Sequence, residues 1–296
     1  MHVSVIIPTY QREEILLDTL RCLRELKPAP AEIILVDQTS RHQGHVEEML
    51  ISLEKNGDIR WIRLAAPSIP YAMNVGLQEA RNEIVLFLDD DIMPDKKLIE
   101  AHLAAHKEGG VGIVAGRVIQ PWDNDESVAD DSVFRFASRT RQMINEFMGG
   151  NFSIKRSLAL ERGGFDENFV RVAYQFEAEF AFRLRQADHK IYFEPKACIH
   201  HLKAKSGGTR LFGDHLTTFK PDHAVGAYYY IFRTWTGWKS LFDLFYRPVR
   251  SVATRHHLYH PWWIPVTLIA ETLGLVWATA LAIKGPRYIS AERIMK

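Results

Sequence analysis

Cysteine is scarce in this sequence, because the 296 residues contain only Cys22 and Cys198. Two cysteines cannot form a disulfide framework, and neither stands in the C-x-x-C spacing that holds zinc. Net charge is also small, with a formal total of +1 at pH 7. The chain therefore has no overall field that would attract nucleic acid or an acidic substrate. These absences are typical of a protein from a reducing compartment that does not bind nucleic acid.

Two common phosphate-binding motifs and an export signal are also missing. No G-x-G-x-x-G follows the first strand-like run, and G-x-x-x-x-G-K-[ST] does not occur, so dinucleotide-binding and P-loop proteins lose their usual support. The chain opens directly in the strand-like run 2–7, without a charged and then apolar leader. We therefore expect a cytoplasmic protein. With 47% hydrophobic and 25% charged residues, the composition is that of a folded globular protein.

The first ninety residues alternate strand-like and helical patterns. Leu16, Leu20 and Leu23 recur at helical spacing and predict a helix over residues 12–26. A second helix is expected near residues 70–80. Short strand-like runs separated by helices predict a parallel sheet covered on both faces, and hence an α/β fold. The runs are residues 3–7, 33–36, 61–64 and 84–88.

Polar residues follow three of these strand-like runs. They are Thr9-Tyr10 after the first, Asp37 after the second and Asp89-Asp90-Asp91 after the last. Ligands of such sheets bind outside the carboxyl ends of the strands, so we expect these residues to share one crevice. Three adjacent carboxylates repel one another unless a cation shares their charge, and Mg²⁺ or Mn²⁺ takes oxygen ligands. The alternative is a solvated acidic turn, and Asp37 by itself would be an ordinary turn residue.

The same segments resemble the successive signatures of family 2 glycosyltransferases. The resemblance implies a GT-A-like fold, which is a nucleotide-binding, mostly parallel twisted sheet flanked by helices. It also implies a Mn²⁺ or Mg²⁺ ion and transfer, with inversion, of a sugar from a UDP-, GDP- or dTDP-sugar to a saccharide or lipid-linked acceptor. The matching segments stand in the family's order at residues 3–10, 34–37, 74–76, 87–91, 149–153 and 163–167.

The resemblance also implies roles for particular residues. Asp37 would accept a hydrogen bond from the base, Asp89 would face the ribose or sugar, and Asp91 would ligate the metal. Gly150 and Asn151 fall in a segment similar to the family's acceptor side. Arg210 lies in residues 206–210, which is either a loop that closes over the diphosphate or a plain flexible loop. The remaining residues expected around the nucleotide are Pro8, Thr9, Tyr10, Asn74 and Asp90.

A general base is expected in the helical segment that starts near residue 176. Phe176, Phe180 and Leu184 recur at helical spacing and place Glu177 near the helix start, where an anionic carboxylate is stabilised. The segment resembles the family's Glu-Asp-x-Asp/Glu-Leu helix, but Glu177 replaces the usual Asp. We predict Glu177 as the base and keep Glu179 as its rival and as an acceptor-side residue. A solvated acidic helix face is the alternative without function.

One further metal ligand is expected from the adjacent histidines His200 and His201. In some relatives a histidine near this point completes the metal site, and we assign the role to His200 while leaving His201 open. Surface or hydrogen-bonded core histidines are the alternative.

The composition changes near residue 225, where we place a domain boundary. Residues 1–225 are expected to form the catalytic domain, with 1–115 binding the donor and 116–225 the acceptor. Residues 226–296 are expected to form an aromatic and apolar helical tail that associates with membranes. From Trp262 to Ile283 the only formal charge is Glu271, so this stretch either lies in the membrane interface, spans the membrane, or is core or a dimer contact.

The sequence thus predicts a metal-dependent glycosyltransferase at the inner face of the cell membrane, acting in surface polysaccharide or glycolipid synthesis. A nucleotidyltransferase is a second interpretation, but it would carry a glycine-rich phosphate loop after the first strand. A third is a membrane-tethered module that binds nucleotide but has lost catalysis.

Overall fold

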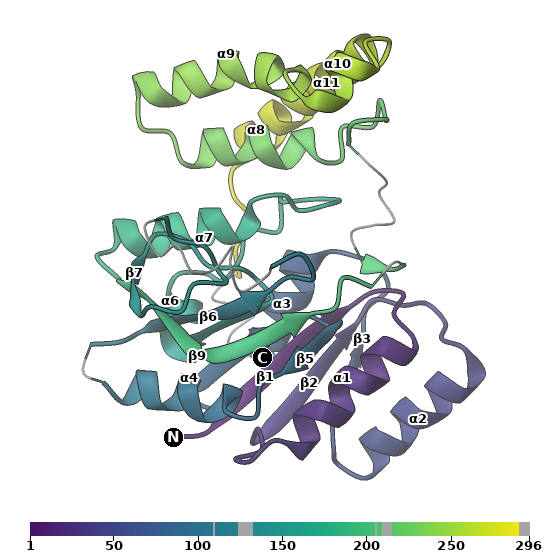
Figure 1. The fold of residues 1–296 in the computed structure, drawn as a ribbon, viewed down its shortest axis with the longest axis vertical. Coiled ribbons are helices and arrows are strands. Elements are labelled where there is room, and N and C mark those ends of the chain that lie inside the picture. The colour runs from purple at the N-terminus through teal and green to yellow at the C-terminus, as the bar shows by residue number, and fades with distance from the viewer. Residues whose placement is uncertain (109, 124–132, 205, 209–214, 290–296) are drawn as a thin grey trace.

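The structure is a computed structural model, and it describes residues 1–108, 110–123, 133–204, 206–208 and 215–289. An α/β layer built on one mixed sheet forms the larger part of the molecule (Figure 1). A layer of helices from the C-terminal part of the chain stands on one end of it.

The N-terminal half of the sheet is parallel, as predicted. Its strands are β1 (Val3–Thr9), β2 (Glu32–Asp37), β3 (Arg60–Arg63) and β4 (Ile84–Leu88), in the order β3-β2-β1-β4. All three pairings among them are parallel. Because the strands run the same way, the residues after β1, β2 and β4 end at the same edge of the sheet.

Helices cover both faces of this half, which explains why its strands are apolar throughout. Helix α1 (Glu14–Glu25) and helix α2 (Gly44–Lys55) pack on one face, where Leu16 and Leu50 share one core cluster with Val5. Helix α3 (Ile69–Glu79) packs on the other face, where Leu77 meets Ile6. The helices predicted over 12–26 and 70–80 are thus confirmed as α1 and α3.

The second half of the sheet is mixed rather than parallel. Strand β8 (Asn151–Lys155) runs antiparallel to β4, and β6 (Ile113–Ile119) pairs antiparallel with β8 but parallel with β9 (Ile191–His201). Strands β5 (Ile92–Pro94) and β7 (Gln142–Ile144) both pair antiparallel with β9. The alternation that predicts a parallel sheet belongs to the first ninety residues alone. Helices α4 (Leu98–Lys107), α6 (Arg156–Glu161) and α7 (Phe176–Gln186) complete this part.

Phenylalanine rings join β4, β8 and α7 into one core. Phe87 stacks on Phe152 with ring centroids 4.9 Å apart, and Phe147 stacks on the other side of Phe152 at 4.1 Å. Phe165 lies edge-on to Phe87 and within 4.7 Å of Phe180 on α7. This packing fixes the start of α7, and therefore Glu177, against the end of β4.

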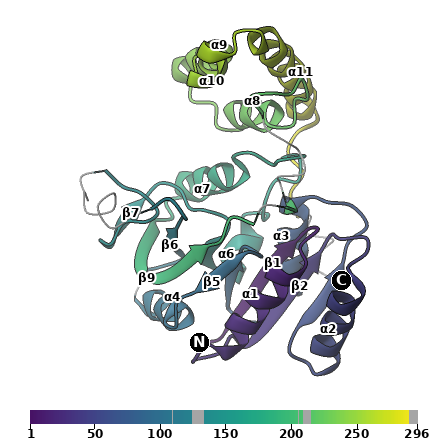
Figure 2. The ribbon, with the colours of Figure 1, turned by 45° about the vertical axis from the view of Figure 1, so that its right-hand side comes forward.

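The C-terminal layer consists of α8 (Ala224–Arg233), α9 (Trp238–Val252), α10 (Arg255–Tyr259) and α11 (Trp263–Lys284). Helix α8 lies between the α/β layer and the other three helices (Figure 2). Tyr229 on α8 donates a 2.7 Å hydrogen bond to Asp166, and the amide of Arg287 donates to the same carboxylate at 2.9 Å. Because α8 shares the core of the α/β layer, the division at residue 225 stays a prediction.

Candidate active site

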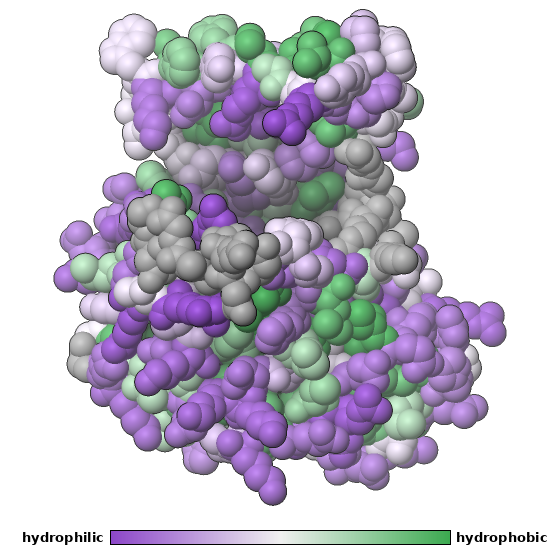
Figure 3. All heavy atoms as spheres, viewed as in Figure 1, coloured by the Kyte–Doolittle hydropathy of each residue, from purple (hydrophilic) through white to green (hydrophobic). Residues whose placement is uncertain are grey.

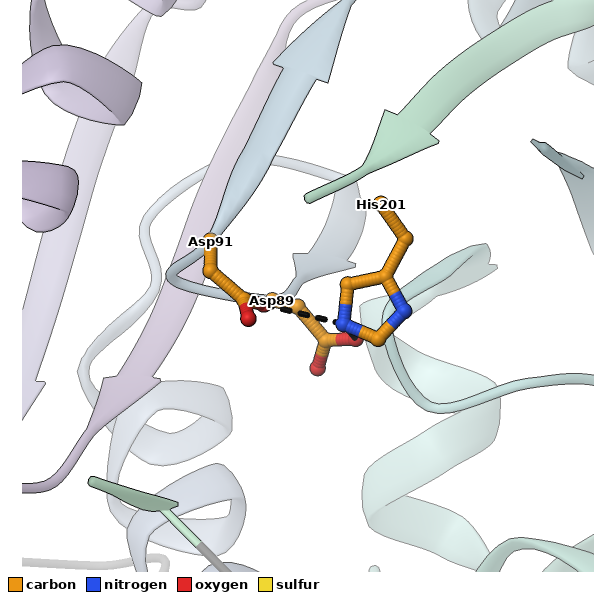
Figure 4. Close-up of side chains that lie close together, drawn as sticks. All are labelled: Asp89, Asp91 and His201. Atoms are coloured by element: carbon orange, nitrogen blue, oxygen red, sulfur yellow. Dashed lines mark ion pairs between the residues drawn. The ribbon is translucent and has the colours of Figure 1, made fainter. Parts of the chain in front are cut away.

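A three-residue group at the end of β4 has the composition of a metal site. Asp89, Asp91 and His201 each offer one ligand atom, and these atoms lie within 4.8 Å of one another (Figure 4). His201 Nε2 lies 2.9 Å from Asp91 Oδ1 and 3.8 Å from Asp89 Oδ2. The other ring nitrogen, Nδ1, lies 3.1 Å from Gln120 Oε1, an acceptor that keeps the proton on Nδ1 and leaves Nε2 to face the aspartates.

His201, and not His200, is therefore the histidine that reaches the aspartates. Both belong to β9, and neighbouring residues of a strand point to opposite faces. Figure 4 shows the imidazole of His201 turned toward the carboxylates of Asp89 and Asp91. The choice of His200 was wrong because the sequence did not fix the phase of β9.

Arg12 supplies a cation to the aspartates that the sequence analysis did not assign. Its Nε lies 3.1 Å from Asp90 Oδ1 and its Nη2 lies 3.4 Å from Asp91 Oδ2. Thr9 donates a 2.8 Å hydrogen bond to the other oxygen of Asp90. Burial nevertheless raises the pKa of Asp90 to about 6, against the opposing charge of Arg12. Asp90 is thus a buried support that orients the turn, while Asp89 and Asp91 face the ligand side.

Asp91 is held as an anion by its neighbours. Burial alone would raise its pKa, but the hydrogen bond and charge of His201, the Ala204 amide at 2.8 Å and Arg12 together lower the pKa below its usual value. A divalent metal would take the place of a proton on His201 Nε2 and would bind Asp91 as the anion.

A cavity of about 180 Å³ opens beside these residues. Its lining includes Pro8, Thr9 and Tyr10, together with the cationic side chains Arg171 and Lys203. Gly208 also lines it, and the amide of Gly208 donates to the Tyr10 carbonyl at 2.8 Å. Gly208 of the predicted loop 206–210 thus borders the cavity, whereas Arg210 lies outside the described residues and its role stays a prediction.

Asp37 lies at the end of β2 with its carboxylate already bonded. Oδ2 accepts from His42 Nε2 at 2.7 Å and from Trp61 Nε1 at 3.0 Å, and Oδ1 accepts from the Thr39 amide at 2.8 Å. Burial would lower the pKa of His42, but the hydrogen bond and charge of Asp37 raise it. Gln38, the next residue, lines the cavity, whereas Asp37 does not. The hydrogen bonds of Asp37 instead hold the end of β2 in place.

Glu177 lies in a second hollow that adjoins the first. This hollow, of about 480 Å³, is lined by Asp89, Glu146 and Glu177, and it shares Pro8, Ile69 and Asp89 with the first. Two consecutive glycines lie against the two carboxylates. A β-carbon at Gly150 would lie 2.0 Å from Asp89 Oδ2, and one at Gly149 would lie 3.0 Å from Glu177 Oε1. Asp89 and Glu177 thus border the same hollow, and the charge of Asp89 acts on Glu177.

The environment of Glu177 suits a proton acceptor. Burial raises its pKa to about 7, and the charges of Asp89 and Glu146 add to this effect against hydrogen bonds from backbone amides. A carboxylate with a pKa near neutrality can hold and release a proton at physiological pH. The raised pKa also means that the ionised side chain does not stabilise the fold, which is common for carboxylates at functional sites.

Glu179, the rival base, faces the protein interior instead. Its side chain is fully buried and pairs with Arg183 at 2.8 Å, and Tyr288 donates to it at 3.2 Å. Residues two apart on a helix point about 200° apart, so only one of Glu177 and Glu179 can face the hollow. The assignment of Glu179 to the acceptor side does not fit this position.

Two predicted ligand contacts are structural braces. Asn74 is buried, donates to the Phe165 carbonyl at 2.9 Å and accepts from the Phe165 amide at 2.8 Å. Asn151 is also buried, donates to the Ala197 carbonyl at 2.9 Å and pairs with His102 at 2.9 Å. Neither amide has a free group for a nucleotide or an acceptor. The expected roles of Asn74 and Asn151 do not fit these bonds, whereas the acceptor-side role of Gly150 stays a prediction.

A larger hollow of about 830 Å³ lies at the opposite edge of the sheet. It is lined by residues at the starts of β2 and β3, including Glu32, Asp58 and Arg60. Glu32 and Arg60 pair with each other there. Since ligands of such sheets bind at the carboxyl ends of the strands, this hollow is not the candidate site.

Solved structures with the same architecture are sugar-transferring enzymes. The chain is similar to GalNAc-T7 with UDP, GalNAc and Mn²⁺, with a TM-score of 0.65 and 18% identity over 86% of this chain and 52% of that one. It is also similar to the mannosyltransferase PcManGT from Pyrobaculum calidifontis in complex with GDP-Man and Mn²⁺, with a TM-score of 0.55 and 18% identity over 96% and 79% of the two chains. The fold is that of the GT-A glycosyltransferases.

Sequence comparison gives the family. The model of glycosyl transferase family 2 matches residues 4–165, more than half of the chain, and the chain therefore belongs to this family. It is 30% identical over 118 residues to the uncharacterized glycosyltransferase YfnE of Bacillus subtilis (strain 168), covering 39% of this chain and 30% of that protein. It is 24% identical over 222 residues to the glucosyl-dolichyl phosphate glucuronosyltransferase of Haloferax volcanii, covering 68% and 69%. The matched segment thus spans less than a third of the Bacillus protein.

Proposed function

We propose that this glycosyltransferase inverts the anomeric carbon of a nucleotide-diphosphate sugar as it transfers the sugar to a hydroxyl group. The observation that carries the proposal is the shared hollow of Asp89 and Glu177, each set against one of two consecutive glycines. One carboxylate belongs to the group with metal-ligand composition, and the other has a pKa of about 7. A donor at the first and an acceptor hydroxyl at the second would meet within this space.

In the proposed step Glu177 takes the proton of the acceptor hydroxyl. The hydroxyl oxygen forms a bond to the anomeric carbon while the bond from that carbon to the diphosphate oxygen breaks. The proton stays on Glu177, and the electron pair leaves with the nucleoside diphosphate. One carboxylate placed opposite the leaving group is sufficient for a single displacement, and such a displacement inverts the anomeric carbon.

The three ligand atoms of Asp89, Asp91 and His201 fit a divalent cation that keeps open positions for diphosphate oxygens. When bound, the ion would offset the negative charge that develops on the departing diphosphate. An imidazole nitrogen in the ligand set favours Mn²⁺ over Mg²⁺, which prefers oxygen ligands alone. The two similar structures named above contain Mn²⁺.

The nucleotide would occupy the cavity formed by residues 8–10 and the aspartates. Arg171 and Lys203 also line this cavity, and their charges suit the diphosphate. Gln38, backed by Asp37, lies where the base would enter. These positions extend the predicted donor contacts of Pro8, Thr9 and Tyr10 by residues that the sequence analysis did not assign.

The acceptor is proposed to be a saccharide or a lipid-linked sugar at the inner face of the cell membrane. The Haloferax relative is named for a glucosyl-dolichyl phosphate. The chain is also 30% identical over 104 residues to chondroitin synthase of Escherichia coli, covering 34% of this chain and 15% of that protein. These names support a role in glycolipid or surface polysaccharide synthesis.

The position of Glu177 favours an active enzyme over a nucleotide-binding module that has lost catalysis. A carboxylate with a raised pKa lowers the stability of the folded protein at neutral pH. A residue that lowers stability is more readily retained during evolution when the activity of the protein requires it.

Turnover of candidate donors tests the proposal. Wild-type protein is incubated with UDP-, GDP- and dTDP-sugars and Mn²⁺, and the released nucleoside diphosphate is measured by chromatography. We expect release from one donor class, abolished by EDTA and by Glu177→Gln. Release from that donor at the wild-type rate in Glu177→Gln would reject Glu177 as the base.

A further inference from the structure

Helix α9 exposes its aromatic side chains and buries polar ones, the opposite of a helix that packs on a protein core. Trp238, Phe242 and Phe245 recur at helical spacing and are 84%, 63% and 72% exposed. The residues that α9 buries are polar, namely Ser240 and Arg247. A helix that packs on a core buries its apolar stripe and exposes its polar one. The outer face of α9 is therefore built for an apolar environment that the described chain does not supply.

Helix α11 presents a second apolar face at the same end of the molecule. Its small residues Ala270, Gly274 and Ala278 are buried, and a β-carbon at Gly274 would clash with α8. Ile269, Leu273 and Val276 are exposed instead. The exposed threonines of this face do not oppose burial in lipid, because their hydroxyls donate to helix carbonyls. These bonds run from Thr272 to Leu268 and from Thr279 to Leu275, at 2.9 and 2.8 Å.

The single carboxylate of α11 points into the helical layer. Glu271 is buried and pairs with Arg247 of α9. Arg247 Nη2 lies 3.1 Å from Glu271 Oε1, and Arg247 Nε lies 3.1 Å from Glu271 Oε2. By length and composition α11 could cross a bilayer, since its mean hydropathy is 1.8 and 28% of the segment is buried. The ion pair and the contact with α8 instead tie α11 into the layer. Removing this charge from water leaves the exposed face of α11 uncharged between Trp262 and Ile283.

The outer surface of the layer combines these faces with positive charge. Helices α9, α10 and α11 lie beyond α8, at the end of the molecule away from the sheet (Figures 1 and 2). Apolar side chains gather along this end in the space-filling view (Figure 3). Between residues 224 and 262 there are five lysines and arginines but one acidic residue. Lys239, Arg250 and Arg255 are exposed among the aromatic side chains.

We infer that this end of the protein docks on an anionic lipid bilayer, with α9 and α11 lying in the plane of the interface. Aromatic side chains sit at headgroup depth in such interfaces, and cations meet anionic lipid there. The inference deepens the proposed function, because its relevance to a lipid-borne acceptor rests on that function. Tyr174 connects the two regions, since it lines both the Glu177 hollow and a hollow bordered by Arg247 and Arg250.

Vesicle sedimentation of the full chain tests the inference. Vesicles of phosphatidylcholine with phosphatidylglycerol are compared with vesicles of phosphatidylcholine alone, at low and high salt. We expect binding to the anionic vesicles that salt weakens. The double substitution Phe242→Ser with Phe245→Ser should lower vesicle affinity roughly a hundredfold, about tenfold for each aromatic side chain. Met49→Ser, at a half-exposed apolar residue of α2, is the control and should bind as wild type.

Four results would overturn the inference. Wild-type protein could remain in the supernatant with anionic vesicles at low salt, or the double variant could bind them as wild type does. Concentration-dependent self-association that the double variant abolishes, without vesicle binding, would instead assign the face to a second copy of the chain. Resistance of bound protein to alkaline carbonate extraction would show that α11 spans the bilayer.

Donor turnover is measured on the same samples. Unchanged turnover in the double variant separates a failure of membrane docking from a failure of the proposed enzyme. If the double variant does not fold, Trp238→Ser alone and Lys239→Glu with Arg255→Glu each test one part of the surface.

Discussion

Glu177→Gln should inactivate the enzyme and stabilise the protein, while Glu179→Gln should destabilise the protein without removing the general base. Glu177 has a pKa of about 7 instead of the usual 4.5. Since one pKa unit corresponds to about 1.4 kcal/mol, the ionised form lowers the free energy of unfolding by at most about 3.4 kcal/mol. Solvent at the mouth of the hollow reduces this to about 2 kcal/mol. Loss of a general base lowers turnover by roughly 10²–10⁴-fold.

The sign of the pH dependence follows from the raised pKa. Between pH 4.5 and 7 the unfolded chain releases the Glu177 proton while the folded protein keeps it, so stability falls with rising pH across this interval. Below pH 4.5 the penalty is absent, and above pH 7 it is complete. Glu177→Gln should therefore match wild type near pH 4.5 and exceed it by about 2 kcal/mol at pH 8. Turnover of the wild type should rise with pH to an apparent pKa near 7 and then level off.

Urea unfolding at both pH values, together with donor turnover, checks this prediction. Glu179→Gln serves as the matched control two residues away. It removes the carboxylate partner of Arg183, which should lower stability by about 3 kcal/mol. Larger losses are not expected, because Arg183 keeps its bonds to the carbonyls of Arg162 and Gly164 and burial raises the pKa of Glu179. Its folded fraction should still bind nucleotide. A less stable Glu177→Gln at pH 8, or one with near wild-type turnover, would refute the reasoning.

Three further predictions concern the donor side. Arg12→Ala should lower the free energy of unfolding by about 3–5 kcal/mol in urea titrations, because it leaves a buried carboxylate without its cation; a change below about 1 kcal/mol would contradict the role given to this pair. His201→Ala should weaken Mn²⁺ binding at least about tenfold in titration calorimetry while His200→Ala leaves it unchanged, and equal effects would remove His201 from the ligand set. Gly150→Ala should abolish Mn²⁺-dependent nucleotide binding with the fold intact by circular dichroism, since the new β-carbon would meet Asp89; normal binding would show that this carboxylate can move.

The elements that sequence predicted well are those whose pattern repeats along the chain. Leu16, Leu20 and Leu23 give the buried face of α1, and the apolar run 84–88 gives a fully buried β4. The rule that ligands gather at strand ends then brought residues 8–10 and 89–91 to one cavity. These predictions rest on the local spacing of apolar residues and on one rule about where ligands bind in a parallel sheet. Both can be read from the sequence without knowing how side chains are oriented.

The errors concern the direction in which single side chains point. Asn151 and Asn74 have amides suited to a ligand, yet both close hydrogen bonds inside the fold. His200 was preferred to His201 because the phase of β9 cannot be deduced from two adjacent histidines. Arg12 was missed although three adjacent carboxylates require a cation, because only a metal was considered for that role.

Metal-dependent nucleotide binding tests the central claim most directly. UDP, GDP and dTDP are titrated into the purified protein by isothermal calorimetry, first with Mn²⁺ and then with EDTA. The group formed by Asp89, Asp91 and His201 predicts that one of the three nucleotides binds with Mn²⁺ and that EDTA abolishes the binding. A folded protein that binds none of them, or that binds one equally well in EDTA, would contradict a metal-held diphosphate at this site.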